Sequence, residues 1–163
     1  MNVYFGLGSN LGNRLQNLRN ALTKLSSLGK VIKCSDVFAT APWGGVEQPD
    51  YLNACVSVDV DDSMTPPGLL ACVKEYEREL GRVPSVRWGE RKIDIDILLI
   101  EGMTYHSDTL DIPHVSMCER LFVLVPLMQL VPREWTHPVN GKTIGEMIGA
   151  LEGESYPLRI MGL

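Results

Sequence analysis

The chain has 163 residues, 45% of them hydrophobic and 21% charged, and a formal net charge of −5. Its length and composition predict a globular protein of one domain over residues 1–163. The acidic balance argues against a non-specific nucleic-acid binder, which normally has a basic face. No run approaches the roughly 20 apolar residues that span a membrane, and no signal-peptide pattern is visible. Because the four cysteines lack metal or disulfide spacing, we expect reduced thiols and a cytoplasmic protein.

The first part of the chain predicts a strand followed by an amphipathic helix. Alternating apolar residues predict a strand over 2–8, and leucines at helical spacing predict a helix that ends near residue 28. We expect Asn10 or Asn13 to cap this helix and Gly29 to end it. The glycines at 6, 8 and 12 do not match the dinucleotide-binding pattern, because the third is misplaced. Gly8 is better interpreted as room for another group at the strand end.

The middle of the chain predicts two more strands and a second helix. One strand is expected over 30–40 and another over 51–61, where clean alternation indicates that one face lies on a core. Between them, the Pro- and Gly-rich stretch 41–50 predicts either a mobile cover or an ordinary long loop. Thr65, Pro66 and Pro67 open the helix that Gly81 ends. Its buried stripe is expected to comprise Leu69, Val73, Tyr76 and Leu80, with Glu75, Glu77, Arg78 and Glu79 on the exposed side.

The order strand, helix, strand, strand, helix, strand predicts an α+β fold of the ferredoxin-like type. This is a β-α-β-β-α-β antiparallel sheet with both helices on one face, which leaves the other face free for a site. A C-terminal extension follows, with short helices expected from about Pro126 to before Pro132 and over 144–151. His114 follows a proline in a turn, where a histidine is more often structural than catalytic.

The strand over 93–100 carries the strongest chemical signal. Residues i and i+2 of a strand share a face, so Asp94 and Asp96 project together while Ile93, Ile95 and Ile97 point into a core. Paired carboxylates on an apolar strand favour a hard cation such as Mg²⁺, which usually brings phosphates with it. Basic residues just upstream, including Arg91, are suitable phosphate donors. An Asp-x-Asp pair without a metal remains an alternative, because such pairs occur by chance.

Five motifs in order along the chain carry a resemblance to a known family. They are Gly8-Ser9-Asn10-Leu11-Gly12, Gln48-Pro49-Asp50-Tyr51-Leu52-Asn53, Gly81-Arg82, the long run from Arg87-Trp88-Gly89-Glu90-Arg91 to Asp94-Ile95-Asp96-Ile97-Leu98, and Ile112-Pro113-His114 with Arg120-x-Phe122. Over essentially its whole length the chain resembles the 6-hydroxymethyl-7,8-dihydropterin pyrophosphokinases of folate synthesis. The resemblance implies a diphosphotransferase that moves pyrophosphate from ATP to the pterin hydroxymethyl oxygen and releases AMP.

The resemblance also implies roles for individual residues. Asp94 and Asp96 would bind two Mg²⁺ ions and, with Arg82 and Arg91, form the catalytic set. The implied pterin-binding residues are Thr40, Pro42, Gly44, Tyr51, Asn53, Trp88 and Phe122. The implied ATP-binding residues are Glu77, Arg82, Arg91, Ile97, His114 and Arg120. Loops 41–50 and 82–92 would close over the substrates. For the general base, Asp96 and metal activation of the hydroxyl both stay open.

Some positions depart from the family pattern. Pro84-Ser85 stands in a shortened basic loop where an arginine is common, Thr109 replaces an arginine that often contacts ATP, Lys74 replaces a frequent Gln, and Glu90 a frequent Pro.

We expect small-molecule substrates only, no nucleic-acid or membrane partner, and a monomer. The alternative function is a non-catalytic ferredoxin-like module that binds a nucleotide or RNA, which would need a basic, aromatic sheet face.

Overall fold

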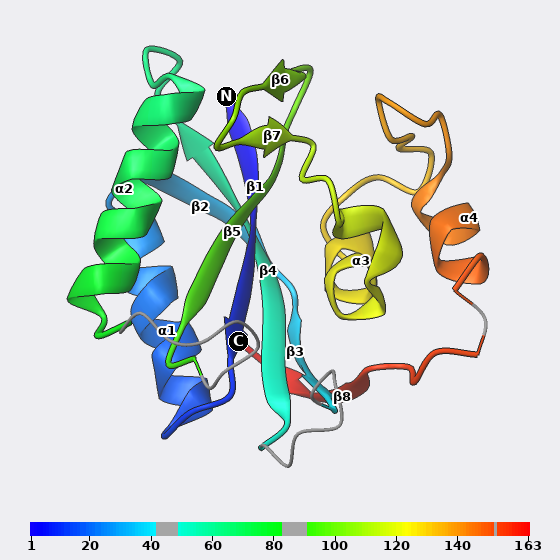
Figure 1. The fold of residues 1–163 in the computed structure, drawn as a ribbon, viewed down its shortest axis with the longest axis horizontal. Helices are drawn as coiled ribbons and strands as arrows, with labels where there is room; N and C mark the ends of the chain where they lie inside the picture. The colour runs from blue at the N-terminus through cyan, green and yellow to red at the C-terminus, as the bar shows by residue number, and fades with distance from the viewer. Residues whose placement is uncertain (42–48, 83–90, 152) are drawn as a thin grey trace.

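A computed structural model describes residues 1–41, 49–82, 91–151 and 153–163. In it an antiparallel sheet separates α1 and α2 from α3, with α4 outside α3 (Figure 1). None of the helices in these ranges is long and apolar enough to cross a membrane. In chain order the elements are β1 (Asn2–Ser9), α1 (Arg14–Leu25), β2 (Gly29–Cys34), β3 (Asp36–Thr40), β4 (Tyr51–Val60), α2 (Pro66–Glu79), β5 (Asp94–Ile100), β6 (Tyr105–His106), β7 (Asp111–Ile112), the 3₁₀ helix η1 (Met117–Glu119), α3 (Leu121–Met128), α4 (Ile144–Gly149) and β8 (Leu158–Gly162).

The main sheet has the strand order β5-β1-β4-β3-β8, and β2 pairs with β4 beside β3. The prediction of one strand over 30–40 was wrong, because the segment is divided at Ser35 into β2 and β3. The Ser35 N–H donates to the Cys55 carbonyl (2.9 Å), and its hydroxyl oxygen accepts from the Cys55 N–H (2.8 Å). Ser35 thus makes two hydrogen bonds to Cys55 of β4 at the point between β2 and β3, and both of these strands pair with β4.

The face of the sheet under α1 and α2 carries the larger core. Ile93, Ile95 and Ile97 are at most 3% exposed and belong to it, as the alternation around Asp94 predicts. Each fully buried large aliphatic side chain of this kind contributes roughly 1.5–3 kcal/mol of hydrophobic stabilisation. This packing fixes the orientation of β5, so both aspartates must face the opposite side of the sheet.

Helix α1 begins as predicted but ends early. The Asn13 side chain accepts from the Gln16 N–H, so Asn13 is the cap, and the helix ends at Leu25 rather than at Gly29. Gly29 is the first residue of β2. A side chain has no room at this position: a Cβ built there would lie 2.0 Å from the Asp59 carbonyl oxygen. The requirement for glycine therefore comes from strand pairing.

Gly29→Ala should destabilise the fold by ~2–3 kcal/mol, because the methyl group has no room beside the backbone of β4. Urea unfolding of the variant measures this loss. Gly145→Ala is the matched control, since nothing lies within 4 Å of a Cβ at this position of α4. The control should be neutral or gain up to about 1 kcal/mol from helix propensity. Equal stability of the two variants would contradict the packing argument.

The opposite face of the sheet is only partly free, which corrects the prediction of an open face. Cys55, Ser57 and Leu98 are at most 2% exposed on this side, because α3 packs over the middle of the sheet. Helix α3 begins at Leu121, five residues before the predicted start, and contains Pro126. The proline ring lacks an N–H, but burial of nearly the whole helix outweighs the lost bond.

The last part of the chain contains one predicted helix and one strand that the sequence did not indicate. Helix α4 has the capping box of Thr143 and Glu146. Strand β8 pairs with β3, yet all five of its residues are exposed. Backbone hydrogen bonds and the ion pair between Arg159 and Asp36 (2.6 Å) hold it there. A strand that buries neither face has no periodic pattern to detect.

Candidate active site

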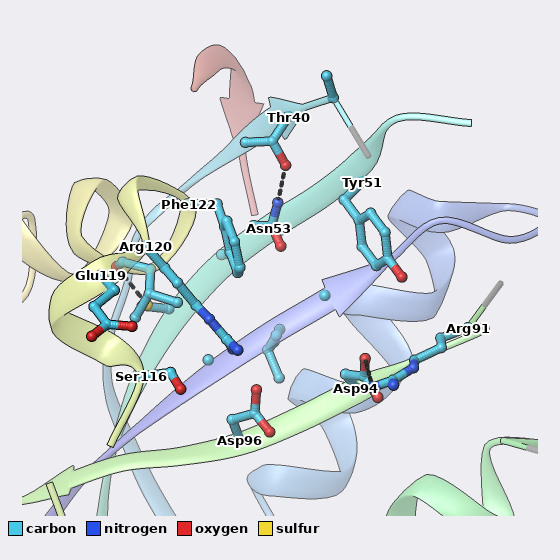
Figure 2. A pocket seen from close by; sticks show the side chains of 17 residues that line it. Thr40, Tyr51, Asn53, Arg91, Asp94, Asp96, Ser116, Glu119, Arg120 and Phe122 are labelled. Carbon is cyan, nitrogen blue, oxygen red and sulfur yellow. Dashed lines mark hydrogen bonds and ion pairs between the residues drawn. The ribbon is translucent and has the colours of Figure 1, made fainter. Parts of the chain in front are cut away.

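The uncovered end of the sheet forms the floor of a pocket of about 510 Å³ (Figure 2). Strand register places three pairs of same-face residues side by side across β4, β1 and β5. These six residues are Asn53 and Cys55, Gly8 and Gly6, and Asp94 and Asp96. The middle strand thus carries no side chains where its neighbours carry polar groups. This arrangement creates a hollow between an amide and two carboxylates.

Gly8 leaves the space that the sequence indicated. A Cβ at Gly8 would lie 3.2 Å from Asn53 Oδ1, whereas one at Gly6 would lie 3.3 Å from the Leu98 side chain. Asn53 is 5% exposed, and its Nδ2 donates to Thr40 Oγ1 (2.8 Å). The amide is therefore held in one orientation, with its oxygen beside Gly8.

Gly8→Ala should weaken binding of a ligand at Asn53 several-fold, because the new methyl group pushes the amide oxygen from its position. Gly6→Ala adds the same group to the same face of β1, but against a flexible leucine side chain, and should have a smaller effect. Titration of both variants with the pterin that the resemblance implies distinguishes them. Equal affinities would show that the position of the Asn53 amide does not matter.

Asp94 lies between two arginines. Arg82 Nη2 is 3.0 Å from Asp94 Oδ1, and Arg91 Nη1 is 3.0 Å from Asp94 Oδ2. Burial raises the pKa of the Asp94 carboxyl above its ordinary value, while the positive charges of Arg82 and Arg91 oppose this rise. Asp96 also lines the pocket, and Figure 2 shows its carboxylate turned toward the same space. Two carboxylates and nearby guanidinium groups thus meet at one end of the pocket.

The residues after β1 hold this end of β5. Asn10 Oδ1 accepts from the Arg91 N–H (2.7 Å), and the Asn10 N–H donates to the Arg91 carbonyl (3.1 Å). The Ser9 hydroxyl donates to the Lys92 carbonyl (2.6 Å) and accepts from the Asn17 amide (3.0 Å). The Gly-Ser-Asn motif therefore fixes the backbone from which Arg91 and Asp94 project.

Glu77 is buried rather than exposed, which corrects the interpretation based on helical spacing. It is 2% exposed, and its Oε1 accepts from the Ile95 N–H (2.8 Å). Its other oxygen accepts from Lys74 Nζ (2.9 Å) and forms an ion pair with Arg82. A carboxylate can be buried when cationic groups pair with it. The periodicity of the helix does not show such partners, so it could not predict that Glu77 is buried.

The upper wall of the pocket has aromatic and hydroxyl groups. Thr40, Tyr51 and Phe122 line it, and the Arg120 guanidinium lies 5.7 Å from the centre of the Phe122 ring. Burial, together with the negative charge of Asp94, raises the pKa of the Tyr51 hydroxyl. Burial also raises the pKa of the Cys55 thiol on the floor, so this sulfur stays a neutral thiol rather than a nucleophile.

The structure brings together eight of the residues singled out from the sequence. Those that line the pocket are Thr40, Tyr51, Asn53, Arg91, Asp94, Asp96, Arg120 and Phe122. Pro42, Gly44 and Trp88 lie outside the described residues. Loops 41–50 and 82–92 are described only at their ends.

Four further candidates do not line the pocket: Glu77, Arg82, Ile97 and His114. The Ile97 side chain is in the core, so only its backbone is available to a ligand. The His114 N–H donates to the Leu98 carbonyl (2.7 Å), and its Nδ1 accepts from the Ser116 N–H (3.2 Å). Ser116 and Glu119 line the pocket but were missed, because only their proximity to Arg120 in sequence pointed to them.

The carboxylates of the pocket fit a hard cation that receives its remaining oxygen ligands from a bound phosphate compound and from water. Within the described ranges, no three His, Cys, Asp or Glu side chains form a complete metal cage. Asp94 and Asp96 nevertheless offer carboxylate oxygens on one face of β5, beside side-chain-free positions of β1. Mg²⁺ commonly takes one or two carboxylates and completes its octahedron with waters and substrate phosphates. The residues present therefore fit magnesium bound together with a phosphate ligand.

Comparison with known proteins identifies close relatives. The family model for 7,8-dihydro-6-hydroxymethylpterin-pyrophosphokinase matches residues 4–132. A 2-amino-4-hydroxy-6-hydroxymethyldihydropteridine pyrophosphokinase of Methylorubrum extorquens is 39% identical over 152 residues, which cover 92% of this chain and 93% of that protein. The protein of the same name from Aquifex aeolicus is 35% identical over 144 residues, with 88% of each chain covered.

Solved structures share the fold at lower sequence identity. A structure described as HPPK-DHPS in complex with substrates superposes with a TM-score of 0.71 at 15% identity and covers 91% of this chain. The wild-type HPPK-DHPS of Plasmodium falciparum gives a TM-score of 0.67, also at 15% identity. This chain spans 43% and 44% of their lengths. At this identity the likeness concerns the fold alone.

Proposed function

The chain belongs to the 7,8-dihydro-6-hydroxymethylpterin-pyrophosphokinase family, and we infer that it transfers pyrophosphate from ATP to 6-hydroxymethyl-7,8-dihydropterin in folate synthesis. The match over residues 4–132 and the near-complete coverage of the bacterial relatives carry this conclusion. The pocket supports this function, because it combines paired carboxylates, arginines and an oriented amide. We propose that the reaction takes place there.

We propose that the fold is ferredoxin-like with a C-terminal extension. If β2 and β3 are counted as one interrupted strand, the sheet order β5-β1-β4-β3 supports this description. Helices α1 and α2 lie together on one face, as that fold requires (Figure 1). Elements β6, β7, η1, α3, α4 and β8 then make up the extension, and residues 1–163 form one domain.

Asp94 and Asp96 are the proposed ligands of two Mg²⁺ ions. When bound, these ions neutralise phosphate charge and polarise the groups that react. The chain's own contribution is to hold both carboxylates on one face of β5, with the isoleucine core behind them. The empty positions at Gly6 and Gly8 leave the space that hydrated ions and phosphates need.

The guanidinium groups are proposed to bind the ATP phosphates. Arg82 and Arg91 pair with Asp94, and Arg120 lines the pocket from the position before α3. Arginine suits this role because its planar fork donates two hydrogen bonds to phosphate oxygens. These charges stabilise the negative charge that develops as the bond to the α–β bridging oxygen breaks. His114 and the backbone of Ile97 complete the proposed nucleotide site, and Glu77 contributes through Arg82.

The proposed pterin site lies on the other side of the floor. Asn53 carries an amide that both donates and accepts, which matches the edge of a pterin. The Phe122 ring lies beside this amide in Figure 2 and offers a face for stacking. Thr40 orients the amide, and Tyr51 closes the wall toward Asp94. Pro42, Gly44 and Trp88 stay in the proposed set on the resemblance alone.

The decisive experiment is an assay with ATP, 6-hydroxymethyl-7,8-dihydropterin and Mg²⁺ that separates AMP from ADP. The expected result is pterin-dependent release of AMP with formation of the pterin diphosphate, and its loss on chelation of the metal. Release of ADP alone, or turnover that does not depend on the pterin, would overturn the proposed reaction.

A monomeric state and a cytoplasmic location complete the proposal. All four cysteines are free thiols, which supports a reducing compartment. An RNA-binding module is disfavoured, because the uncovered part of the sheet carries the carboxylates of Asp94 and Asp96, which repel the phosphates of an RNA backbone. Light scattering across a concentration series tests the oligomeric state.

A further inference from the structure

We propose that Glu77 is a positioning residue that acts on nucleotide binding through Arg82, and that Arg82 so placed competes with metal for Asp94 until nucleotide binds. This inference rests on the proposed function, because it takes Asp94 and Asp96 as the metal site and the arginines as phosphate donors. It replaces direct contact between Glu77 and the nucleotide with an indirect role.

The geometry of Glu77 leaves its carboxylate fully engaged within the protein. The side chain is 2% exposed and does not line the pocket. One oxygen accepts from the Ile95 N–H of β5 (2.8 Å), and the other contacts Lys74 and Arg82. The Glu77 carbonyl also accepts from the Arg82 N–H (2.9 Å). Glu77 therefore holds both ends of Arg82, its backbone and its guanidinium.

Arg82 transmits this restraint to the proposed metal site. One terminal nitrogen pairs with Glu77, while the other lies 3.0 Å from Asp94 Oδ1. Arg91 occupies the second oxygen of the same carboxylate. Both Asp94 oxygens thus face guanidinium groups in the structure. A cation that binds Asp94 must weaken at least one of these pairs, because like charges at one carboxylate repel.

Nucleotide changes this competition, because phosphate oxygens attract the same guanidinium groups. When ATP phosphates take Arg82 and Arg91, Asp94 becomes available to the metal that the phosphates also hold. Metal and nucleotide binding are then positively coupled through the arginines. Glu77 sets the strength of this coupling, because an unrestrained Arg82 side chain would lose rotamer entropy on binding phosphate.

Glu77→Gln and Arg82→Gln test the proposal. In Glu77→Gln, the amide can still accept from the Ile95 N–H, but it turns N–H groups toward Arg82 and displaces the guanidinium. Both variants should lower the affinity for α,β-methylene ATP about fivefold or more. Both should raise the affinity for Mn²⁺ in nucleotide-free protein, measured as free Mn²⁺ by electron paramagnetic resonance. Damage to the fold would lower both affinities. A lower affinity for the nucleotide together with a higher affinity for Mn²⁺ therefore identifies a positioning role.

The double variant separates an indirect role from direct contact. If Glu77 acts through Arg82, the double variant should bind the nucleotide analogue as weakly as Arg82→Gln alone, whereas independent contacts would give additive losses. Additive losses, or unchanged Mn²⁺ affinity in both single variants, would overturn the inference. Arg78→Gln is the matched control: this arginine is 74% exposed and pairs with Glu75 on α2, so both affinities should match those of the unchanged protein.

One further variant keeps the two proposals distinct. Asp96→Asn should strongly lower Mn²⁺ binding by the protein in the presence of α,β-methylene ATP, measured beyond the Mn²⁺ that the analogue binds in protein-free solution. If it does and the Glu77 and Arg82 losses add, the metal site stands and the positioning role fails. If Mn²⁺ binding survives in Asp96→Asn, the metal site of the proposed function is itself wrong, and the inference fails with it.

Discussion

Asp96→Ala is expected to reduce pterin-dependent release of AMP by about 10³-fold or more, while the chain remains folded. Asp96 lines the pocket on the face of β5 opposite the isoleucine core, so its truncation removes no packed apolar group. The variant should therefore unfold near the same denaturant concentration as the unchanged protein. A large kinetic loss without a stability loss identifies a group that acts on the reacting phosphates.

Metal titration gives the reason for this loss. With Asp96 replaced, a single strand carboxylate remains, and the affinity for Mn²⁺ in the presence of nucleotide should fall in parallel with activity. Asp108→Asn is the control, since this aspartate is exposed and lies outside the pocket. It removes the same charge from the chain and should leave the release of AMP unchanged. Retained turnover in Asp96→Ala would eliminate a metal role for this residue.

The aspartate pair was predictable because two independent patterns coincide on β5. Isoleucines at alternate positions specify the core face, and a period of two then places Asp94 and Asp96 together on the other face. The structure adds the reason that the pair is accessible. Its neighbours on β1 are glycines. Which residues of two strands lie opposite each other depends on how the strands pair, and the sequence of one strand does not show this.

Contacts between distant parts of the chain account for the features that the sequence did not indicate. Glu77 lies next to Tyr76 of the expected buried stripe, but a carboxylate is assigned to solvent unless its partners are known. Those partners, Arg82 and the Ile95 N–H, lie outside α2. Pro126 indicated a helix start, although the apolar run from Leu121 already forms the buried helix. That helix covers part of the face expected to be free. The site consequently occupies one end of the sheet.

Asn53→Ala is expected to lower kcat/KM for the pterin by about 10²-fold, with little change in the KM for ATP. The amide is 5% exposed and is oriented by its bond to Thr40 Oγ1, so it is ready to bind before the pterin arrives. A pterin edge that loses this partner is desolvated without a replacement hydrogen bond, which costs more than the bond itself contributes.

Thr40→Val separates recognition from orientation at the same site. Valine keeps the shape of the threonine but removes the oxygen that accepts from Asn53 Nδ2. The amide then keeps its groups but loses its fixed orientation, so the pterin affinity should fall by less than in Asn53→Ala. Isothermal titration with the pterin in the presence of α,β-methylene ATP measures both losses. A larger loss in Thr40→Val would mean that the threonine, and not the amide, recognises the pterin.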